Sequence, residues 1–415
     1  MKIKNRFWLC ICLPALLFSA CDVLPKPEPD PPGPPPEKAY HAEILWEREI
    51  NRYIYIDDGI PLIEGQYCYI PTYENYLGGG SNIVKINMET GRVEWENRAG
   101  GGFSSEKPQK IDAHIYLERE SGILFVYNDS DGKLAATVML GNDETEAKNN
   151  DIKFSTPVAV SGPYLFWGNA PDLPDLRGLM RFNSALIDFS IAPNVIQNIA
   201  PELIWSNSWQ ARIYTDLIPE DRILYFLTKS YMPENPGVLI ALDAETGDMI
   251  WEREVPHCQG TGYSSLVLNG DKLLVVEGTF SSYDKLTGTP VLENIPLGYE
   301  GRYSITLNNN RLFYSNNRWL ISVNADTGAL IWTVSPAEDT YFRTSPLVNN
   351  GQVFILHDTG LRVYNSDTGE FVGVDGLFPV GYLWRDAYAI AAYKDVCIFN
   401  SSDYVIAIRA NMEEP

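Results

Sequence analysis

DAETGDMIWEREV, residues 243–255, is nearly repeated as NADTGALIWTVSP at residues 324–336. In both copies an acidic or amide residue, a threonine and a glycine separate two apolar segments. Asp or Asn with Thr and Gly is the chemistry of a tight turn, in which glycine readily adopts a positive φ. Each copy therefore predicts a β-hairpin.

The hairpin motif recurs along most of the chain. Further copies are NMETGRVEW at 87–95, NDSDGKLAA at 128–136, DKLTGTPVL at 284–292 and NSDTGEFVG at 365–373. Their glycines are Gly91, Gly132, Gly247, Gly288, Gly328 and Gly369, spaced by 40 or 41 residues except between Gly132 and Gly247. A period in the forties is typical of a propeller or a solenoid.

A second hairpin precedes the later copies in the same phase, with turns near Gly270, Asn310 and Gly351. Two hairpins per period give four strands per period, which is the make-up of a propeller blade. The long interval accommodates two periods and an insertion in the third blade. The surplus residues are PDLPDLRG at 171–178 and SALIDFSIAPNVIQNIAPE at 184–202.

The segments near the two ends of the chain together supply the four strands of one blade. YVIAIRAN at 404–411 has no outer strand after it, and EILWEREI at 43–50 has no blade before it. We expect the N-terminal segment to be the outermost strand of the last blade, which removes the free edges of an open stack. The predicted fold is all-β, an eight-bladed β-propeller of four-stranded antiparallel blades over residues 43–415, with this Velcro closure in its last blade.

The pattern ALDAETGDMIW at 241–251 resembles the PQQ-type propeller repeat of quinoprotein dehydrogenases and of BamB-like outer-membrane lipoproteins. The resemblance covers about residues 43–411 and weakens where Ala136, Leu292 and Gly373 replace the tryptophan. It implies that the repeat tryptophans pack blade against blade, because aromatic side chains bury large areas. These tryptophans are Trp46, Trp95, Trp251 and Trp332.

The composition excludes one class of partner. The formal net charge is −22, from 54 acidic and 32 basic residues. Nucleic-acid binding requires a basic face for the phosphates, so we expect no nucleic-acid partner. The repeat indicates one large domain, which we expect to be a monomeric propeller.

The N-terminal sequence predicts where in the cell the protein is located. Lys2, Lys4 and Arg6 precede a short apolar stretch, and Ser19 and Ala20 precede Cys21. This resembles a bacterial lipoprotein signal, with cleavage after residue 20 and lipid attachment at Cys21; an ordinary signal peptide is the alternative. Acylation would anchor the chain to a membrane, which the resemblance suggests is the outer membrane, facing the periplasm or the cell surface.

Residues 21–42 read as a lipidated cysteine and a linker. The proline-rich stretch DVLPKPEPDPPGPPPEKAY, residues 22–40, favours an extended polyproline conformation and would span roughly 60 Å. Of the remaining cysteines, Cys68 and Cys397 lie in apolar strand patterns, which predicts buried thiols, and Cys258 makes the count odd.

Two surfaces are candidates for binding. The segments that lead into the innermost strands carry aromatic and arginine side chains, which would form a rim for an anion or a glycan at one mouth of the channel. The rim residues are Arg212, Tyr263, Arg302, Arg343, Trp384 and Arg385. The alternative is that the aromatic residues pack between blades and the arginines pair with carboxylates.

The second surface is the blade 3 insertion, whose apolar residues would dock a partner protein if they are exposed together. The candidate docking residues are Leu186, Ile187, Phe189 and Ile191. The alternative is that they fold back onto the blade. NDSDG at 128–132 offers carboxylates for calcium, but it stands where the repeat demands a turn, so we predict no metal and no cofactor.

The sequence favours a non-enzymatic lipoprotein that serves as a protein–protein interaction scaffold in the cell envelope. The BamB resemblance implies partners in the assembly of outer-membrane β-barrels. A glycan- or anion-binding lipoprotein is an alternative, and a degenerate PQQ-dependent dehydrogenase is a third. The paired adjacent cysteines and calcium ligands that the resemblance implies for such dehydrogenases have no match here, so we predict no catalytic residues.

Overall fold

The computed structural model divides into two units, Met1–Ala39 and Tyr40–Pro415, and every described residue belongs to the second. The described residues are 42–49, 61–73, 80–100, 107–119, 123–140, 156, 158–169, 178–206, 211–213, 215–230, 236–256, 265–297, 305–316, 318–336, 341–358, 360–373, 390–394, 396–401 and 404–410. Within these ranges no helix has the length and apolar character needed to cross a membrane.

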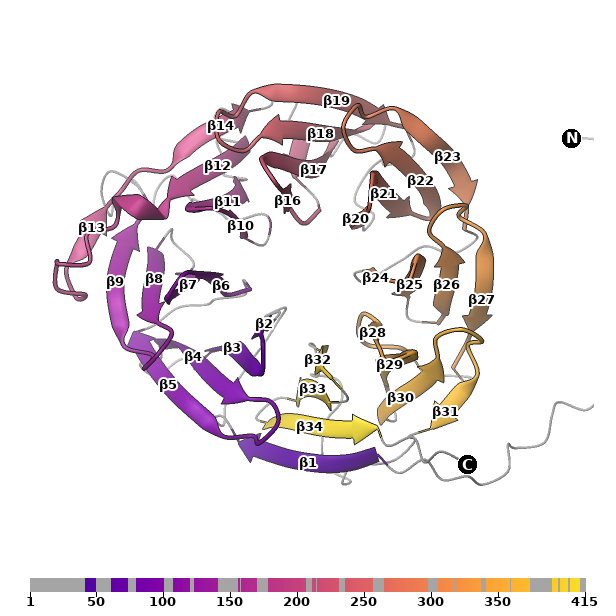
Figure 1. Ribbon diagram of the computed structural model, residues 1–415, viewed down its shortest axis with the longest axis horizontal. Coiled ribbons are helices and arrows are strands. Elements are labelled where there is room, and N and C mark those ends of the chain that lie inside the picture. The colour runs from indigo at the N-terminus through magenta and orange to yellow at the C-terminus, as the bar shows by residue number, and fades with distance from the viewer. Residues whose placement is uncertain are drawn as a thin grey trace, which may run out of the picture. The chain divides into compact units, whose positions relative to one another are not determined.

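The second unit is a ring of eight antiparallel sheets around a central axis, which confirms the predicted eight-bladed propeller (Figure 1). Blade 1 consists of β2 (Leu62–Glu64), β3 (Tyr67–Tyr73), β4 (Gly80–Asn87) and β5 (Val93–Gly100). Blade 2 has β6 (Gln109–Ile111), β7 (His114–Arg119), β8 (Ile123–Asn128) and β9 (Leu134–Met139), and blade 3 has β10 (Ala159–Ser161), β11 (Tyr164–Asn169), β12 (Gly178–Asn183) and β14 (Glu202–Ser206). In each of these blades the first strand is innermost, and in blades 1 and 3 the last strand lies on the circumference.

Blades 4 to 7 repeat this order. Blade 4 contains β15 (Ala211–Ile213), β16 (Ile218–Glu220), β17 (Ile223–Ser230), β18 (Gly237–Asp243) and β19 (Met249–Val255). Blade 5 contains β20 (Ser265–Asn269), β21 (Lys272–Glu277), β22 (Thr279–Asp284) and β23 (Pro290–Pro296). Blade 6 contains β24 (Thr306–Asn308), β25 (Arg311–Ser315), β26 (Leu320–Asn324) and β27 (Leu330–Val334), and blade 7 contains β28 (Leu347–Asn349), β29 (Gln352–His357), β30 (Gly360–Asn365) and β31 (Phe371–Gly373).

Blade 8 joins the two ends of the propeller chain. Its inner strands are β32 (Ile390–Tyr393), β33 (Val396–Ser401) and β34 (Tyr404–Ala410), and its outer strand is β1 (Ala42–Glu49). The antiparallel pairing of β1 with β34 runs from Ala42 opposite Ala410 to Glu49 opposite Tyr404. The predicted closure is therefore confirmed.

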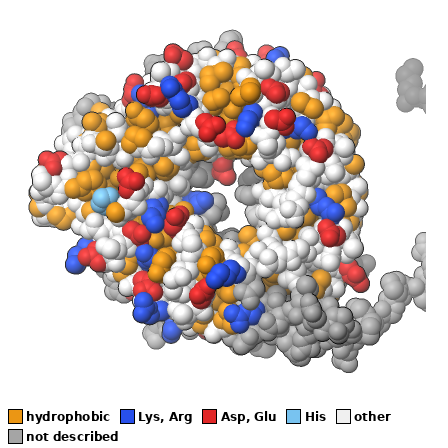
Figure 2. Space-filling view, viewed as in Figure 1, with side chains coloured by type: hydrophobic (Ala, Val, Ile, Leu, Met, Phe, Trp, Pro, Cys, Tyr) orange, Lys and Arg blue, Asp and Glu red, His pale blue; other side chains and the backbone are white. Residues whose placement is uncertain are grey.

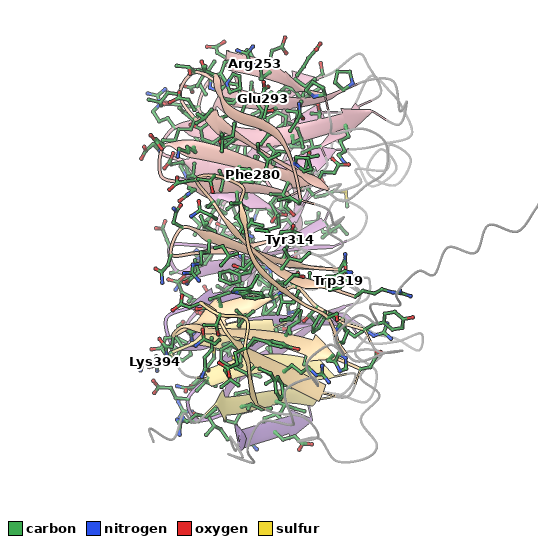
Figure 3. The ribbon with its side chains drawn as sticks, turned by 90° about the vertical axis from the view of Figure 1, so that its right-hand side faces the viewer. Arg253, Phe280, Glu293, Tyr314, Trp319 and Lys394 are labelled. Atoms are coloured by element: carbon green, nitrogen blue, oxygen red, sulfur yellow. The ribbon has the colours of Figure 1, made fainter. Side chains whose placement is uncertain are left out.

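The hydrophobic core is divided among the interfaces between blades. Because side chains alternate along a strand, successive residues of β17 face different neighbours. Leu224 and Phe226 pack with blade 3, whereas Tyr225 and Leu227 pack with blade 5. In the side view, Phe280 of β22 and Tyr314 of β25 lie within the wall of the ring, where both belong to the core between blades 5 and 6 (Figure 3).

One strand departs from the expected arrangement. The insertion contains the short 3-10 helix η2 (Ser184–Leu186) and the strand β13 (Ile196–Asn198). Instead of staying in blade 3, β13 pairs in parallel with β9 and becomes the outermost strand of blade 2. The insertion thus ties blade 3 to blade 2 on the circumference, where Figure 1 shows β13 outside the ring of other strands.

Candidate functional site

The repeated turns connect the third and fourth strands of a blade. In blade 1 the Asn87 side-chain oxygen accepts hydrogen bonds from the backbone N–H groups of Glu89 and Thr90, both at 3.1 Å, and Gly91 has a φ of 66°. Asp243, Asp284, Asn324 and Asn365 hold their turns in the same way. The turn chemistry read from the sequence is therefore confirmed, and these turns share one face of the ring with the turns between first and second strands. We call this the turn face.

Each repeat tryptophan lies against the turn of the following blade. Trp46, Trp95 and Trp332 are buried and Trp251 is half-buried. A Cβ atom placed on Gly91, Gly132, Gly288 or Gly369 would lie within 3 Å of Trp46, Trp95, Trp251 or Trp332, respectively. The four indole N–H groups donate to backbone oxygens of the same turns, on Met88, Asp129, Lys285 and Ser366, at 2.8–3.0 Å. The tryptophan and the glycine therefore form one contact between neighbouring blades.

This contact explains where the repeat lacks its tryptophan. Ala136 of blade 2 faces blade 3, in which the insertion stands in place of the turn. Gly373 of blade 7 faces blade 8, whose fourth strand is the separate segment β1, so that blade 8 has no such turn. At Leu292 the turn of blade 6 remains, and Gly328 approaches Phe280 and Ile295 instead. The tryptophan is thus absent at Ala136 and Gly373, where the following blade has no repeat turn for it to contact.

Ion pairs add to these contacts on the turn face. Lys394 of blade 8 pairs with Glu89 of blade 1 at 2.5 Å, Lys272 of blade 5 with Asp326 of blade 6 at 2.7 Å, and Arg311 of blade 6 with Asp367 of blade 7 at 2.9 Å. Figure 3 places Lys394 on this face and Trp319 on the opposite face. Pairs of this kind are individually weak at a surface, but they repeat the same blade-to-blade register.

The NDSDG turn, the sequence candidate for calcium, is held by lysines. The Asp129 carboxylate accepts hydrogen bonds from Lys85 at 2.6 Å and Tyr69 at 2.5 Å, and it pairs with Lys110 at 3.1 Å. Partial burial raises the pKa of the Asp129 carboxyl, but the bonds from Lys85, Tyr69 and Lys110 outweigh it and hold the pKa below its usual value. Among the described residues no three His, Cys, Asp or Glu side chains gather as metal ligands.

We expect Asp129→Asn to reduce the free energy of unfolding at pH 7 by about 1–3 kcal/mol, because two lysines lose their counter-charge. The pKa is lowered on folding, so this stability is present above the unfolded pKa of about 3.9 and is lost as pH falls through the folded pKa. Urea unfolding at pH 7 and at about pH 3 measures the difference between wild type and variant, which should shrink at the lower pH. Asp131→Asn is the control, because Asp131 is exposed and, among the described residues, its ion pair is with Lys133 of the same turn. A difference for Asp129→Asn that is unchanged by pH would contradict the assignment.

The insertion is fixed to blade 2 by specific contacts. Gln197 is buried, and its side chain accepts from the Asp188 backbone N–H at 2.9 Å and donates to the Asp188 backbone oxygen at 3.0 Å. The Thr137 hydroxyl donates to the Pro193 backbone oxygen at 2.8 Å. These bonds hold the segment before β13 against the outer edge of the sheet.

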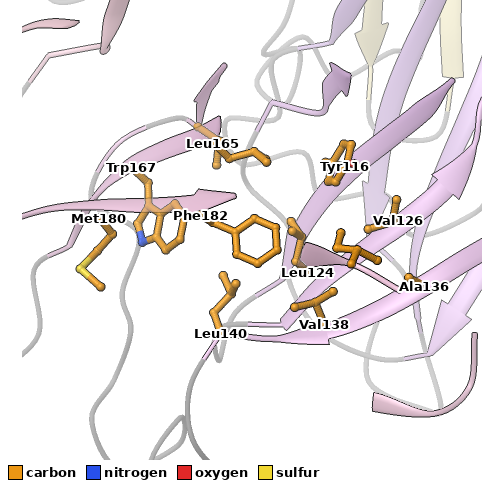
Figure 4. Packing of buried hydrophobic residues seen from close by; sticks show 12 residues of the cluster. Tyr116, Leu124, Val126, Ala136, Val138, Leu140, Leu165, Trp167, Met180 and Phe182 are labelled. Atoms are coloured by element: carbon orange, nitrogen blue, oxygen red, sulfur yellow. The ribbon is translucent and has the colours of Figure 1, made fainter. Parts of the chain in front are cut away.

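For Ile187 the structure has the alternative that the sequence left open, in which the side chain folds back onto the blade. Its side chain is only 6% exposed and packs in the core between blades 2 and 3 with Ala136, Val138 and Phe182. Figure 4 shows Phe182 of blade 3 pointing toward Val138 and the other core side chains of blade 2. Ile187 therefore belongs to the core and not to the exposed surface of the insertion.

The other apolar residues of the insertion reach solvent. Leu186 is 59% exposed and Phe189 43%, while Ile191 is intermediate. Val195 and Ile196, beside and within β13, are 50% and 47% exposed. The hydrophobic side chains gather over β13 and η2 in Figure 2. We call Leu186, Phe189, Val195 and Ile196 the insertion patch.

The insertion patch includes an aromatic contact that the sequence did not suggest. The Phe189 ring stacks on the His114 imidazole, with centroids 4.3 Å apart and an interplanar angle of 8°. His114 begins β7, far from the insertion in sequence, and no motif marks it. Val195 and Ile196 were visible as apolar letters, but only the pairing of β13 with β9 places them on the circumference.

The predicted channel rim falls largely outside the described residues, as do Cys21 and Cys258. Tyr263, Arg302, Trp384 and Arg385 are not described, and for Arg212 only the backbone position in β15, opposite Lys229, is given. Arg343 donates from Nε to Asp358 at 2.5 Å and lies 5.5 Å from the centre of the Tyr341 ring. This pairing is the alternative that the sequence left open for the rim arginines.

The two described cysteines are buried. Cys68 and Cys397 are free thiols in the cores of blades 1 and 8, as their strand patterns predicted. Burial raises the pKa of the Cys68 thiol to about 12, so it stays protonated at neutral pH.

Solved structures share the fold. BamB from Moraxella catarrhalis is 12% identical, with a TM-score of 0.60, over 90% of this chain and 99% of that one. The quinohemoprotein alcohol dehydrogenase from Comamonas testosteroni is 10% identical, with a TM-score of 0.64, over 91% of this chain and 78% of that one. The computationally designed Ika8 protein is 14% identical, with a TM-score of 0.61, over 89% of this chain and 99% of that one. At these identities the similarity shows the fold alone.

The sequence itself gives the family. No curated protein matches it significantly. The family model described as "Outer membrane protein assembly factor BamB" matches residues 39–164, 195–293 and 297–391, which together make up more than half of the chain. The protein therefore belongs to the BamB family of outer membrane protein assembly factors.

Proposed function

We propose that the protein is a non-enzymatic interaction scaffold of the cell envelope, and that the insertion patch docks a protein of the outer-membrane assembly machinery. The observation that carries the proposal is the exposure of four large apolar side chains on a segment braced by Gln197 and Thr137. Exposed apolar surface on a rigid support marks sites of protein interaction. The family description supports the choice of partner.

The N-terminal region supplies the anchor in this proposal. Residues 1–20 are the signal peptide, Cys21 carries the lipid, and residues 21–42 link the anchor to the propeller at 43–415. The lipid holds the ring near the outer membrane, where assembly proteins work, and the proline-rich linker sets the reach. A closed ring suits this role, because the interfaces between its blades fix the position of the loops.

Affinity capture from detergent-solubilised envelope tests the proposal. We expect the full chain to fractionate with membranes and to retain outer-membrane assembly proteins, identified by mass spectrometry. The double substitution Leu186→Asp with Phe189→Asp should reduce their recovery at least about tenfold, because each buried apolar side chain contributes about 1.5–3 kcal/mol.

The matched control is Leu286→Asp, because Leu286 is 62% exposed on a repeat turn of blade 5, away from the insertion. It should leave recovery unchanged. Equal recovery with the double variant would exclude the insertion patch, and absence of assembly proteins from the wild-type capture would exclude the scaffold function itself.

A further inference from the structure

The strand β13 is an edge with a defined direction. It ends the sheet order β13-β9-β8-β7-β6, and it pairs with β9 in parallel, so it differs from the antiparallel outer strands of the other blades. An edge strand presents backbone N–H and C=O groups to a further strand. In Figure 1 no described strand lies beyond β13.

The outward peptide groups of this edge can be identified. The Ile199 N–H donates to the Met139 backbone oxygen at 3.0 Å, so Ile199 faces β9. Because backbone groups alternate in direction along a strand, Gln197 also faces β9, and the N–H and C=O groups of Ile196 and Asn198 point away from it. Within the described part of the chain, neither Ile196 nor Asn198 forms a backbone hydrogen bond outside the β13–β9 pair.

Apolar and acidic side chains surround the edge. Ile196 and Val195 are half-exposed, and Gln197 joins β13 to Asp188, which lies between Leu186 and Phe189 in the chain. Residues 184–202 contain Asp188 and Glu202 and no lysine, arginine or histidine. Glu202 pairs with Arg181. The Asp188 carboxylate is exposed and accepts hydrogen bonds from the Ser190 backbone N–H and hydroxyl. The patch therefore offers apolar contacts and a negative charge.

Part of this surface lies outside the range that the family model matches. The family model stops at residue 164 and resumes at 195, so the segment that carries Leu186 and Phe189 lies outside it. The formal net charge of −22 opposes close contact between two copies and favours a basic partner. Strand addition to a free edge is an established mode of peptide recognition, in which the backbone gives affinity and alternate side chains give specificity.

We propose that β13 binds an extended segment of a partner protein as an added strand, and that this segment alternates apolar side chains with lysine or arginine. The Ile196 and Asn198 backbone groups bond to it, the insertion patch receives its apolar side chains, and Asp188 attracts its basic ones. This inference rests on the proposed function, because it specifies the partner chemistry of the same surface.

Fluorescence anisotropy with the full chain and a labelled peptide of about ten alternating valine and lysine residues tests the inference at about 0.15 M salt. We expect saturable binding. Asn198→Pro removes one outward N–H and leaves the β9 side of the strand unchanged, so the affinity should fall about tenfold. Leu286→Asp is the control and should bind as the wild type does.

Two altered peptides test the same step without changing the protein. A peptide with N-methyl groups on alternate residues, and one with glutamate in place of lysine, should each bind at least about tenfold more weakly. Equal binding of either one, no binding of the valine–lysine peptide, or a dimer of the chain that Asn198→Pro dissociates would each overturn the inference. If the peptide binds in this way but the envelope capture contains no assembly proteins, only the proposed function is refuted. If assembly proteins are captured but peptide binding does not respond to Asn198→Pro or to N-methylation, only the strand-addition inference is refuted.

Discussion

Trp46→Ala should reduce the free energy of unfolding by about 3–5 kcal/mol, which is the range for removing a large buried aromatic side chain. Trp46 is 8% exposed, its indole N–H donates to the Met88 backbone oxygen at 3.0 Å, and its ring lies against Gly91. It also belongs to β1, so its loss weakens the only strand that joins the two ends of the ring. Urea unfolding followed by circular dichroism measures the change.

Trp251→Ala is the matched comparison. Trp251 has the same repeat position and the same kind of bond, to the Lys285 backbone oxygen at 3.0 Å, but it is half-buried and lies within a continuous blade. Its substitution should be less costly than that of Trp46. A loss below about 1 kcal/mol for Trp46→Ala, as for an ordinary surface position, would show that β1 does not close the ring.

Gly369→Ala should cost about 2–5 kcal/mol, from the sum of a left-handed backbone and an overpacked contact. Its φ is 71°, and a Cβ atom there would lie 2.7 Å from the nearest ring atom of Trp332. The indole is held by its bond to the Ser366 backbone oxygen, so it cannot withdraw without losing that bond. The same unfolding measurement applies.

Gly351→Ala separates the two contributions. Gly351 belongs to the same blade and has a φ of 73°, but nothing lies within 4 Å of its Cβ position. It should cost only about 1–2 kcal/mol for the backbone. If the two variants lose the same stability, the tryptophan–glycine contact does not contribute to the packing between blades.

Much of the fold could be predicted from the sequence, because each repeat contains the residues that determine its own turn and its own contact with the next blade. Asp243 and Gly247 predict the turn at 243–247, and Trp251 after it predicts the interface with the next blade. The closure of the ring could also be predicted, because YVIAIRAN at 404–411 lacks an outer strand after it and EILWEREI at 43–50 resembles one. The absence of a tryptophan at Ala136 and Gly373 was visible as well, but its reason required knowing which blades lack the turn that would cover it.

The candidate site was harder to predict, because it depends on pairing between segments that are distant in sequence. No local pattern says that IQN at 196–198 adds to β9 in parallel, or that Phe189 meets His114. Leu186 and Ile187 are adjacent and equally apolar, yet one is 59% exposed and the other 6%. Which of the two enters the core depends on how the insertion packs between blades 2 and 3, and no local sequence pattern states that.

The closed ring depends on the pairing of β1 with β34, and hydrogen exchange read by mass spectrometry measures that pairing. The amides of residues 404–410, and those amides of residues 42–49 that face β34, should exchange slowly and together, because they form one antiparallel ladder. In Trp46→Ala both segments should lose protection while blade 5, residues 265–297, keeps it. Rapid exchange of residues 42–49 in the wild type, at the rate of an unstructured peptide, would contradict the closed ring.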